Sequence, residues 1–355
     1  MTYSLINIVP GETEESLIES ILDYLETIGK IEYPKDPKTP REALLKDLFK
    51  ERKERIKYQK VAFDEIENKV IALAYILIKT EDNPEFDKGK QIANFDLTVL
   101  KEYAHLEIIE ELFITIVQET KNFDYVTTVK GCNIWEEEWN LWLKHEADHF
   151  DTVEVNRLYF DEVNWELMDQ WREEGKRNAK FENISLLRFE ECPEEILEDY
   201  SKLYTEAGNL IPYEDEDKNE EKCLETPSSR RTREEIRRNL GEVWLTLVSK
   251  EENGKLSGFT EITYSPEKAH IAVQQLTGVT PQYRGRGLGK WLKAEMLFLV
   301  KEMMPKVIVI HTGNSKVNAP MLAINERMGF RSVLTVKCFS LNIKENYVQH
   351  TSYLT

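Results

Sequence analysis

The sequence contains few cysteines. Among its 355 residues there are four, Cys132, Cys192, Cys223 and Cys338. They form neither a C-x-x-C pair nor a cluster with histidine, which excludes the common zinc-binding and redox patterns. His145 and His149 have the four-residue spacing of a metal pair on a helix, but a third ligand is not evident. We therefore predict reduced, buried thiols and no metal site.

Basic residues and long apolar runs are also scarce. Lys and Arg number 47 against 65 Asp and Glu, so the net charge is −18. A nucleic-acid backbone or an anionic membrane would repel such a chain, and neither is expected as a partner. The longest aliphatic run, Val70 to Ile78, is too short to span a bilayer. The N-terminus lacks the basic start and apolar core of a signal peptide, which predicts a soluble, cytoplasmic protein.

The length of the chain exceeds the roughly 100 to 200 residues of one ordinary domain. The second half also repeats the first. A shift of 180 residues superposes Val99 on Val279, and a shift of 181 superposes Asn133 on Asn314. We interpret this as an internal repeat and predict two domains, residues 1–175 and 182–355, joined by a Trp-bearing helical connector at 161–181.

Apolar periodicity and turn residues predict the elements of both halves and an α/β (α+β) fold. In the first half we expect helices at 14–27, 40–57, 106–121 and 136–147, and strands at 3–9, 61–65, 70–80, 91–100 and 125–129. In the second half we expect helices at 193–207, 232–239, 288–303 and 318–329. Its strands are expected at 184–189, 243–249, 256–264, 270–279, 307–310 and 332–341, with a last one from Tyr347.

The most informative stretch is Thr277 to Trp291, TGVTPQYRGRGLGKW. A strand ends there, Pro281 breaks its ladder, and three glycines at alternate positions lead directly into an amphipathic helix. Glycines at a helix start allow unpaired backbone N–H groups to approach an anion, which the helix dipole also attracts. Arg284 and Arg286 add positive charge. The stretch therefore predicts a phosphate or carboxylate site; an empty tight turn is the alternative.

Two familiar phosphate loops do not fit this stretch. A P-loop needs four residues between its first Gly and the Gly-Lys pair, followed by Ser or Thr. Here Gly285 and Gly289 enclose three residues, and Trp291 follows Lys290. The dinucleotide fingerprint G-x-G-x-x-G also differs from the G-x-G-x-G of this chain.

The run Gln282 to Gly287, QYRGRG, instead resembles the acetyl-CoA pyrophosphate loop of the GNAT superfamily of N-acyltransferases. That loop has Gln or Arg, two residues, Gly, one residue, and Gly or Ala. The second half also closes as this family does, with Asn318-Ala319-Pro320-Met321 and then Met328-Gly329-Phe330. The resemblance implies two GNAT-like domains, each a mixed, mostly antiparallel sheet flanked by helices. This tandem arrangement is similar to that of mycothiol synthase-like proteins.

The first copy of the repeat looks degenerate. The positions that match Arg284, Gly285 and Gly287 hold Ala104, His105 and Glu107. Side chains and a negative charge thus stand where phosphates would lie. The resemblance therefore assigns acetyl-CoA, as co-substrate, to the second half alone.

The resemblance also names the residues that would hold acetyl-CoA. Backbone N–H groups of Gly278 and Val279, on a strand that separates from its neighbour, would bind the thioester or the pantetheine arm. Asn314 and Asn318 would lie on the pantetheine and adenosine side. The pyrophosphate would contact the loop and helix start, residues Gln282, Arg284, Gly285, Arg286, Gly287, Leu288, Gly289 and Lys290.

The catalytic groups are less evident. An amine is protonated at neutral pH, so a carboxylate or histidine should accept its proton. Glu261, on the strand beside the donor strand, is the candidate base; strand alternation could instead direct it to solvent, and His270 is the second candidate. Asn325 occupies the position where the family often has a Tyr acid. Either Tyr283 or Tyr264 replaces that Tyr, or no acid is needed.

The sequence thus predicts an acetyl-CoA-dependent N-acetyltransferase that acts on the amine of an unidentified small molecule. The alternative is a CoA-binding sensor, or a structural protein, that has lost acyl transfer. A monomer or a homodimer is expected.

Overall fold

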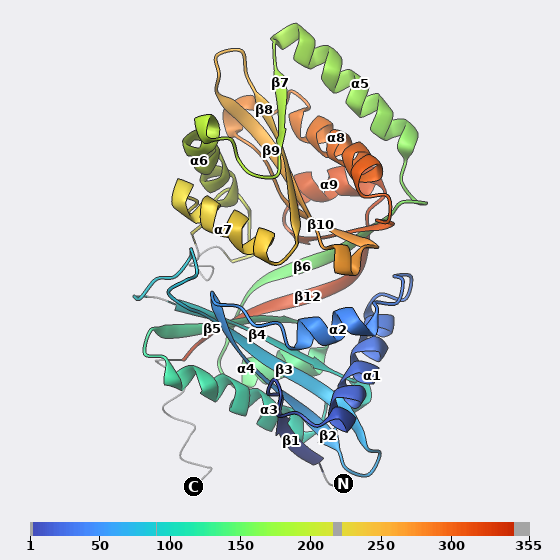
Figure 1. The fold of residues 1–355 in the computed structure, drawn as a ribbon, viewed down its shortest axis with the longest axis vertical. Helices are drawn as coiled ribbons and strands as arrows, with labels where there is room; N and C mark the ends of the chain where they lie inside the picture. The colour runs from blue at the N-terminus through green and yellow to red at the C-terminus, as the bar shows by residue number, and fades with distance from the viewer. Residues whose placement is uncertain (1–2, 90, 216–221, 344–355) are drawn as a thin grey trace. The chain divides into compact units, whose positions relative to one another are not determined.

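The computed structural model describes residues 3–89, 91–215 and 222–343. The chain divides into two compact units (Figure 1). The first unit comprises Met1–Val153, Glu214–Asn219 and Leu334–Thr355, and the second comprises Glu154–Tyr213 and Glu220–Val333. The chain passes from the first unit to the second inside one strand and returns inside another, and a short segment that begins at Glu214 also belongs to the first unit.

The first unit contains a sheet with the strand order β1-β2-β3-β4-β5-β12. Its pairs are antiparallel except for the parallel pair β4 and β5. Helices α1 and α2 pack on one face, and α3 and α4 on the other. The strands are β1 (Tyr3–Asn7), β2 (Arg55–Asp64), β3 (Lys69–Lys79), β4 (Gln91–Val99), β5 (Val126–Asn133) and β12 (Arg331–Asn342). The helices are α1 (Glu15–Glu32), α2 (Arg41–Leu48), α3 (Glu107–Gln118) and α4 (Glu136–Lys144).

The second unit has a sheet with the order β6-β11-β10-β9-β8-β7. Strands β10 and β11 run parallel, and the pairs from β10 to β7 are antiparallel. The core on one face includes α5, α8 and α9, and α6 packs on the other face. The strands are β6 (Asp148–Tyr159), β7 (Ser185–Phe189), β8 (Val243–Lys250), β9 (Leu256–Tyr264), β10 (Ile271–Val279) and β11 (Val309–Ser315). The helices are α5 (Trp165–Glu182), α6 (Leu197–Gly208), α7 (Pro227–Asn239), α8 (Leu288–Met303) and α9 (Ala319–Met328).

The two units differ from the expected division into residues 1–175 and 182–355. Helix α5 is not a connector, because Trp171 is buried in the core of the second unit and Gly175 lies directly against Trp291. Strand β12 pairs with β5, so its residues from Leu334 to Asn342 belong to the first unit. The interleaving follows from a pairing between segments about 200 residues apart, which no local pattern encodes.

Several elements differ from the sequence-based expectation, among them α2, β6 and β11. Helix α2 ends at Leu48, and the next residues lead into β2. Strand β6 was not expected, because its buried face carries polar side chains such as Asp151 and Arg157. Strand β11 covers Val309–Ser315, whereas the sequence predicted a strand at 307–310. The strand expected from Tyr347 lies outside the described residues.

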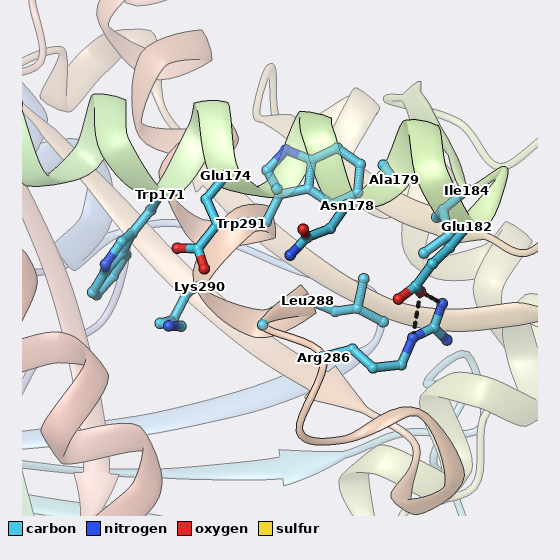
Figure 2. Close-up of a pocket in the computed structure, with 12 residues that line it drawn as sticks. Trp171, Glu174, Asn178, Ala179, Glu182, Ile184, Arg286, Leu288, Lys290 and Trp291 are labelled. Carbon is cyan, nitrogen blue, oxygen red and sulfur yellow. Dashed lines mark hydrogen bonds and ion pairs between the residues drawn. The ribbon is translucent and has the colours of Figure 1, made fainter.

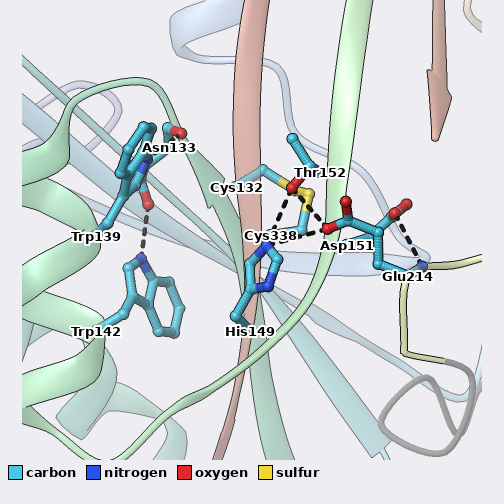
Figure 3. Close-up of a disulfide and its surroundings, with 9 residues drawn as sticks. All are labelled: Cys132, Asn133, Trp139, Trp142, His149, Asp151, Thr152, Glu214 and Cys338. Carbon is cyan, nitrogen blue, oxygen red and sulfur yellow. Dashed lines mark hydrogen bonds and ion pairs between the residues drawn. A yellow bond between two sulfur atoms is a disulfide. The ribbon is translucent and has the colours of Figure 1, made fainter. Parts of the chain in front are cut away.

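The cysteines correct one prediction. Cys132 and Cys338 form a disulfide across 206 residues of sequence (Figure 3). They stand directly opposite each other in the antiparallel pair of β5 and β12, which brings two distant residues into bonding range. Cys132 is exposed, so it is not a buried thiol as expected. Cys192 and Cys223 are thiols, and only Cys192 is buried.

Reduction of this disulfide should destabilise the first unit. The cross-link closes a long loop and restricts the unfolded chain, so we expect its loss to lower the free energy of unfolding by about 2–4 kcal/mol. Urea unfolding with and without dithiothreitol measures the change. The double variant Cys132→Ser, Cys338→Ser should start at the lower stability and not respond to the reductant. Equal midpoints for the wild type in both conditions would contradict the prediction.

Within the described residues, no helix combines the length and apolar character needed to cross a bilayer.

Candidate functional site

Strand β10 loses its neighbour halfway along its length. Its parallel pairing with β11 covers only Ile271 to Val273. Just beyond this pairing, Thr312 Oγ1 donates a hydrogen bond of 3.4 Å to the carbonyl of Gln274. Residues 275–279 of β10 therefore have an edge that β11 does not pair. We call the space between 275–279 and 313–315 the β10–β11 gap.

The alternation of hydrogen-bonded positions along β10 shows which of its backbone N–H groups face this gap. Thr280 donates its N–H to the carbonyl of Ser257 at 3.1 Å. Opposed residues of an antiparallel pair alternate between bonded and non-bonded positions. The N–H of Gly278 therefore points toward β9, whereas those of Thr277 and Val279 point toward the gap. The N–H of Val279 therefore faces the gap, as expected, whereas the N–H of Gly278 does not. The N–H of Thr277, which was not predicted, also faces the gap.

Gly278 has a packing role instead. A Cβ atom at this position would lie 2.4 Å from Cβ of Ala207 on α6. Real side chains never approach so closely, so only glycine allows α6 to cross β10 here. No local sequence pattern indicates this contact, because the two residues are far apart in the chain.

The glycine loop is open, as an anion site requires. Gly285 and Gly287 both have φ of +80°, a backbone conformation that glycine adopts without strain. No heavy atom lies within 4 Å of a Cβ built at Gly285, and the nearest to one at Gly287 is Lys290 Cε at 3.9 Å. Helix α8 begins at Leu288, so its first backbone N–H groups have no intrahelical partner. The loop and the helix start can accept an anion.

The arginine side chains of the loop, which were both expected to attract an anion, differ in their contacts. Arg286 forms ion pairs with Glu182 and Glu251, so its charge is balanced within the protein. Arg284 is exposed, and its Nε donates to the carbonyl of Val279 at 3.0 Å. Attraction for an anion must therefore come mainly from the backbone and from Arg284 and Lys290, with Arg286 fixing the loop.

A hollow lies beside the loop, between α5 and the start of α8 (Figure 2). Glu174 and Asn178 extend from α5 toward Lys290 and Leu288, and the ion pair of Arg286 with Glu182 closes one end. Leu288 is buried and lines this hollow. Gln282 is exposed in the loop. A Cβ atom built at Gly289 would lie 3.8 Å from Cγ2 of Val279.

The asparagines beyond the gap are fixed by helix α9. Asn318 caps this helix, because its side chain accepts a hydrogen bond of 3.4 Å from the N–H of Met321. Asn325 is 1% exposed and donates from Nδ2 to Oδ1 of Asn314 at 2.7 Å. The two residues join β11 to α9 at the border of the β10–β11 gap.

Glu261 is buried in an ion pair. Its side chain is fully buried, and Oε1 accepts hydrogen bonds from Tyr200 Oη at 2.5 Å and Arg230 Nη1 at 2.7 Å. It therefore does not face solvent. Oε2 has no hydrogen-bond partner among the described residues. Burial and the Glu261 charge both raise the pKa of Tyr200 well above its usual value, which keeps its hydroxyl protonated as the donor.

Arg230 is the centre of this buried cluster. It is 0% exposed, pairs with Glu234 at 2.8 Å, and lies 3.7 Å above the Trp244 ring. Burial acts to lower the pKa of Arg230, but its contacts, chiefly with Glu261, outweigh this and raise it. A charged guanidinium therefore holds the Glu261 carboxylate in place.

The remaining candidate groups are scattered. The backbone carbonyl of His270 accepts from the N–H of Ile308 at 3.0 Å, outside the gap. Tyr264 ends β9, and Tyr283 lies under the guanidinium of Arg286 at 5.5 Å. Within residues 3–89, 91–215 and 222–343, no three His, Cys, Asp or Glu side chains group as metal ligands.

His311 was missed by the sequence analysis. It is the last residue of β11 that pairs with β10, and its Nδ1 contacts Nη1 of the buried Arg157. A guanidinium only donates hydrogen bonds, so Nδ1 must accept and the proton of the neutral ring lies on Nε2. No motif identifies this pair, because Arg157 comes from β6, 154 residues away in sequence.

Lys293 is a buried cation of α8 and gives a testable pH dependence. It is 2% exposed, and burial lowers its pKa to about 7. The unfolded value is about 10.4, so the unfolded chain binds more protons between these values and stability rises with pH. We expect the free energy of unfolding to increase by about 2 kcal/mol from pH 7 to pH 9.

Lys293→Met should be more stable than the wild type at pH 7 and should lose this increase. Lys301→Met, at an exposed position of the same helix, should retain it. Urea unfolding at several pH values makes the comparison. A wild-type profile in Lys293→Met would show that Lys293 is not the group responsible.

Comparison with known proteins identifies relatives. Residues 194–330 match the model of the acetyltransferase (GNAT) family. The comparison with curated proteins gives no match. The solved tandem GNAT protein from the clavulanic acid biosynthesis pathway is 16% identical, with a TM-score of 0.67 over 96% of this chain and 98% of that chain. A GCN5-related N-acetyltransferase from Sphaerobacter thermophilus is 13% identical, with a TM-score of 0.62 over 96% of each chain. These likenesses confirm the predicted tandem fold.

Proposed function

We propose that the chain transfers an acetyl group from acetyl-CoA to an amine of a small molecule, at an acyl-donor site in the second unit, where residues 194–330 match the acetyltransferase (GNAT) family. The observation that carries the proposal is the open loop at Gly285 and Gly287. Both glycines have positive φ, and no side chain of the described residues fills the space above Gly285. Such a loop is strained for any other residue and is explained by an anion bound to its backbone.

The residues of the site fit acetyl-CoA as co-substrate. The N–H groups at the start of α8 would bind the diphosphate, and the N–H groups of Thr277 and Val279 would hold the arm and the thioester along β10. Acetyl-CoA would supply an acyl group activated by its thioester. Transfer forms a C–N bond, breaks the C–S bond, and moves one proton from the amine to the sulfur.

The contacts of Glu261 favour a positioning role over that of a base. A proton acceptor must contact the amine, whereas this carboxylate is fully buried and bonded to Arg230 and Tyr200. Asn325 cannot act as an acid in place of a Tyr, because an amide does not give up a proton near neutral pH. A thiol pKa of about 8.5 makes thiolate an acceptable leaving group without an acid.

The same two residues favour the alternative function, a CoA-binding protein without transferase activity. Its donor site would be identical, and only turnover separates the two functions.

Calorimetry and a turnover assay together test the proposal. We expect the intact protein to bind acetyl-CoA and to release free CoA in the presence of a suitable amine from a broad panel. Binding without release for any amine would favour the alternative function. Absence of binding would overturn both.

A further inference from the structure

Helix α5 places a further surface beside the glycine loop. The helix precedes residues 194–330, so it lies outside the stretch that matches the family. A Cβ atom built at Gly175 would overlap the side chain of Trp291, so α5 packs closely on α8. Glu182, the last residue of α5, forms an ion pair with Arg286 of the loop. The C-terminal half of α5 is therefore fixed next to the loop, where a diphosphate is expected.

One aromatic side chain of this helix is almost fully in solvent. Phe181 is 89% exposed, and no large apolar side chain of the described residues is more exposed. Exposure of an apolar ring to water is unfavourable, whereas a heterocyclic base that stacks on the ring removes both surfaces from water. Phe181 precedes Glu182 in the chain, so it is one residue from the ion pair that joins α5 to the loop.

Two polar side chains lie on the same side of α5 as Phe181. Glu174, Asn178 and Phe181 are separated by four and three residues, a spacing that places them along one stripe of a helix. Glu174 and Asn178 are exposed and point into the hollow beside the loop (Figure 2). Helical side chains lean toward the N-terminus, which directs the ring of Phe181 toward Asn178. The stripe thus combines an aromatic ring, an amide and a carboxylate.

This combination is complementary to adenine. An amide side chain can donate to a ring nitrogen of adenine and accept from its exocyclic amino group. A carboxylate only accepts, so Glu174 favours a base with an amino group over one with a carbonyl at that position. Stacking on Phe181 is available to any base, which leaves the choice of base to the two polar side chains. The glycine loop adds a preference for a base that carries a diphosphate.

We propose that Glu174, Asn178 and Phe181 form a base site that, together with the glycine loop, binds an adenosine diphosphate group. The inference rests on the proposed function for one point, the diphosphate at the loop. An adenosine diphosphate group is common to acetyl-CoA and to free ADP. Free ADP therefore competes with acetyl-CoA for the second unit, and the adenine nucleotides around the protein regulate access of the acyl donor.

Calorimetry with ADP and inosine diphosphate tests the choice of base. The two nucleotides share the ribose and the diphosphate, but inosine diphosphate has a carbonyl where ADP has its amino group. We expect the wild type to bind ADP about tenfold more tightly than inosine diphosphate, and acetyl-CoA to displace ADP. Asn178→Leu should remove the preference for ADP. Absence of ADP binding to protein that binds acetyl-CoA, or simultaneous binding of both, would overturn the proposal.

Phe181→Ala tests the stacking surface. It should weaken the binding of ADP and of acetyl-CoA about tenfold. Its thermal midpoint without ligand should equal that of the wild type, because the ring is exposed. Ile66→Ala is the matched control: Ile66 is also apolar and is 69% exposed, but it lies between β2 and β3 of the first unit. This control should bind both ligands as the wild type does.

The outcomes separate the base site from the proposed function. Wild-type affinities for ADP and acetyl-CoA in Phe181→Ala would overturn the base site and leave the proposed function intact. Failure of the wild-type protein to bind acetyl-CoA would overturn the proposed function and the base site with it.

Discussion

Gly287→Glu is expected to abolish acetyl-CoA binding, with an affinity loss of at least about 100-fold. The substitution adds a carboxylate at the start of α8, where the backbone N–H groups should meet a diphosphate. Repulsion between the two anions replaces attraction in a site that the ligand would otherwise desolvate. The protein should still fold, because the nearest atom to the new Cβ is Lys290 Cε at 3.9 Å. Calorimetry with acetyl-CoA measures the loss.

Gly254→Glu separates this effect from backbone strain. Gly254 has φ of +85° and no atom within 4 Å of a built Cβ, so it matches Gly287 in conformation and space. It lies between β8 and β9, outside the loop. Each variant should lose about 1–2 kcal/mol of stability from its positive φ. Only Gly287→Glu should lose the ligand; retained acetyl-CoA binding in that variant would eliminate the proposed donor site.

Arg230→Met is expected to cost about 3–5 kcal/mol of stability. The change leaves the fully buried carboxylate of Glu261 without its counter-charge, and it removes one partner of Glu234. An isolated buried charge is far less stable than the intact pair. Urea unfolding followed by tryptophan fluorescence measures the change, since Trp244 lies directly under the guanidinium.

Arg238→Met tests whether burial of the ion pair causes the loss of stability expected for Arg230→Met. Arg238 also belongs to α7 and pairs with Glu191 at 3.2 Å, but both side chains are more than half exposed. Its substitution should change stability by less than about 0.5 kcal/mol. The double variant Arg230→Met, Glu261→Leu should recover part of the loss, because an apolar pair can replace a buried ion pair. If the double variant is no more stable than Arg230→Met, the cost arises from lost packing.

Local patterns were sufficient for most elements of the fold. Helix α8 runs from Leu288 to Met303, as its apolar spacing and Pro305 predict. Helix α9 has Asn318 as its cap and Gly329 after its end, with φ of +111°, which local chemistry also predicts. Strand β6 escaped prediction because buried positions such as Asp151 and Arg157 are polar; Arg157 contacts His311 of β11, and Asp151 accepts from the N–H of Glu214.

The predictions for the candidate site also divide into those that depend on local sequence and those that depend on tertiary contacts. The glycine loop depends on residues adjacent in sequence, and the structure retains it. The ligand contacts predicted for Arg286 and Gly278 depended instead on the residues that surround them in three dimensions. Arg286 is engaged by Glu182 and Glu251, and Gly278 by helix α6. Neither neighbour could be identified from a short pattern.

The amino-acid sequence alone determined the glycine loop, the helix behind it and the resemblance of residues 194–330 to the GNAT acetyltransferase family, because each depends on residues a few positions apart. Only the tertiary structure decided which groups remain available for a ligand. It joined Cys132 to Cys338, enclosed Glu261 with Arg230, and left Asn325 Oδ1 without a hydrogen-bond donor among the described residues. The physical reason is that burial and pairing are properties of contacts between segments distant in the chain, and those contacts exist only once both sheets have formed.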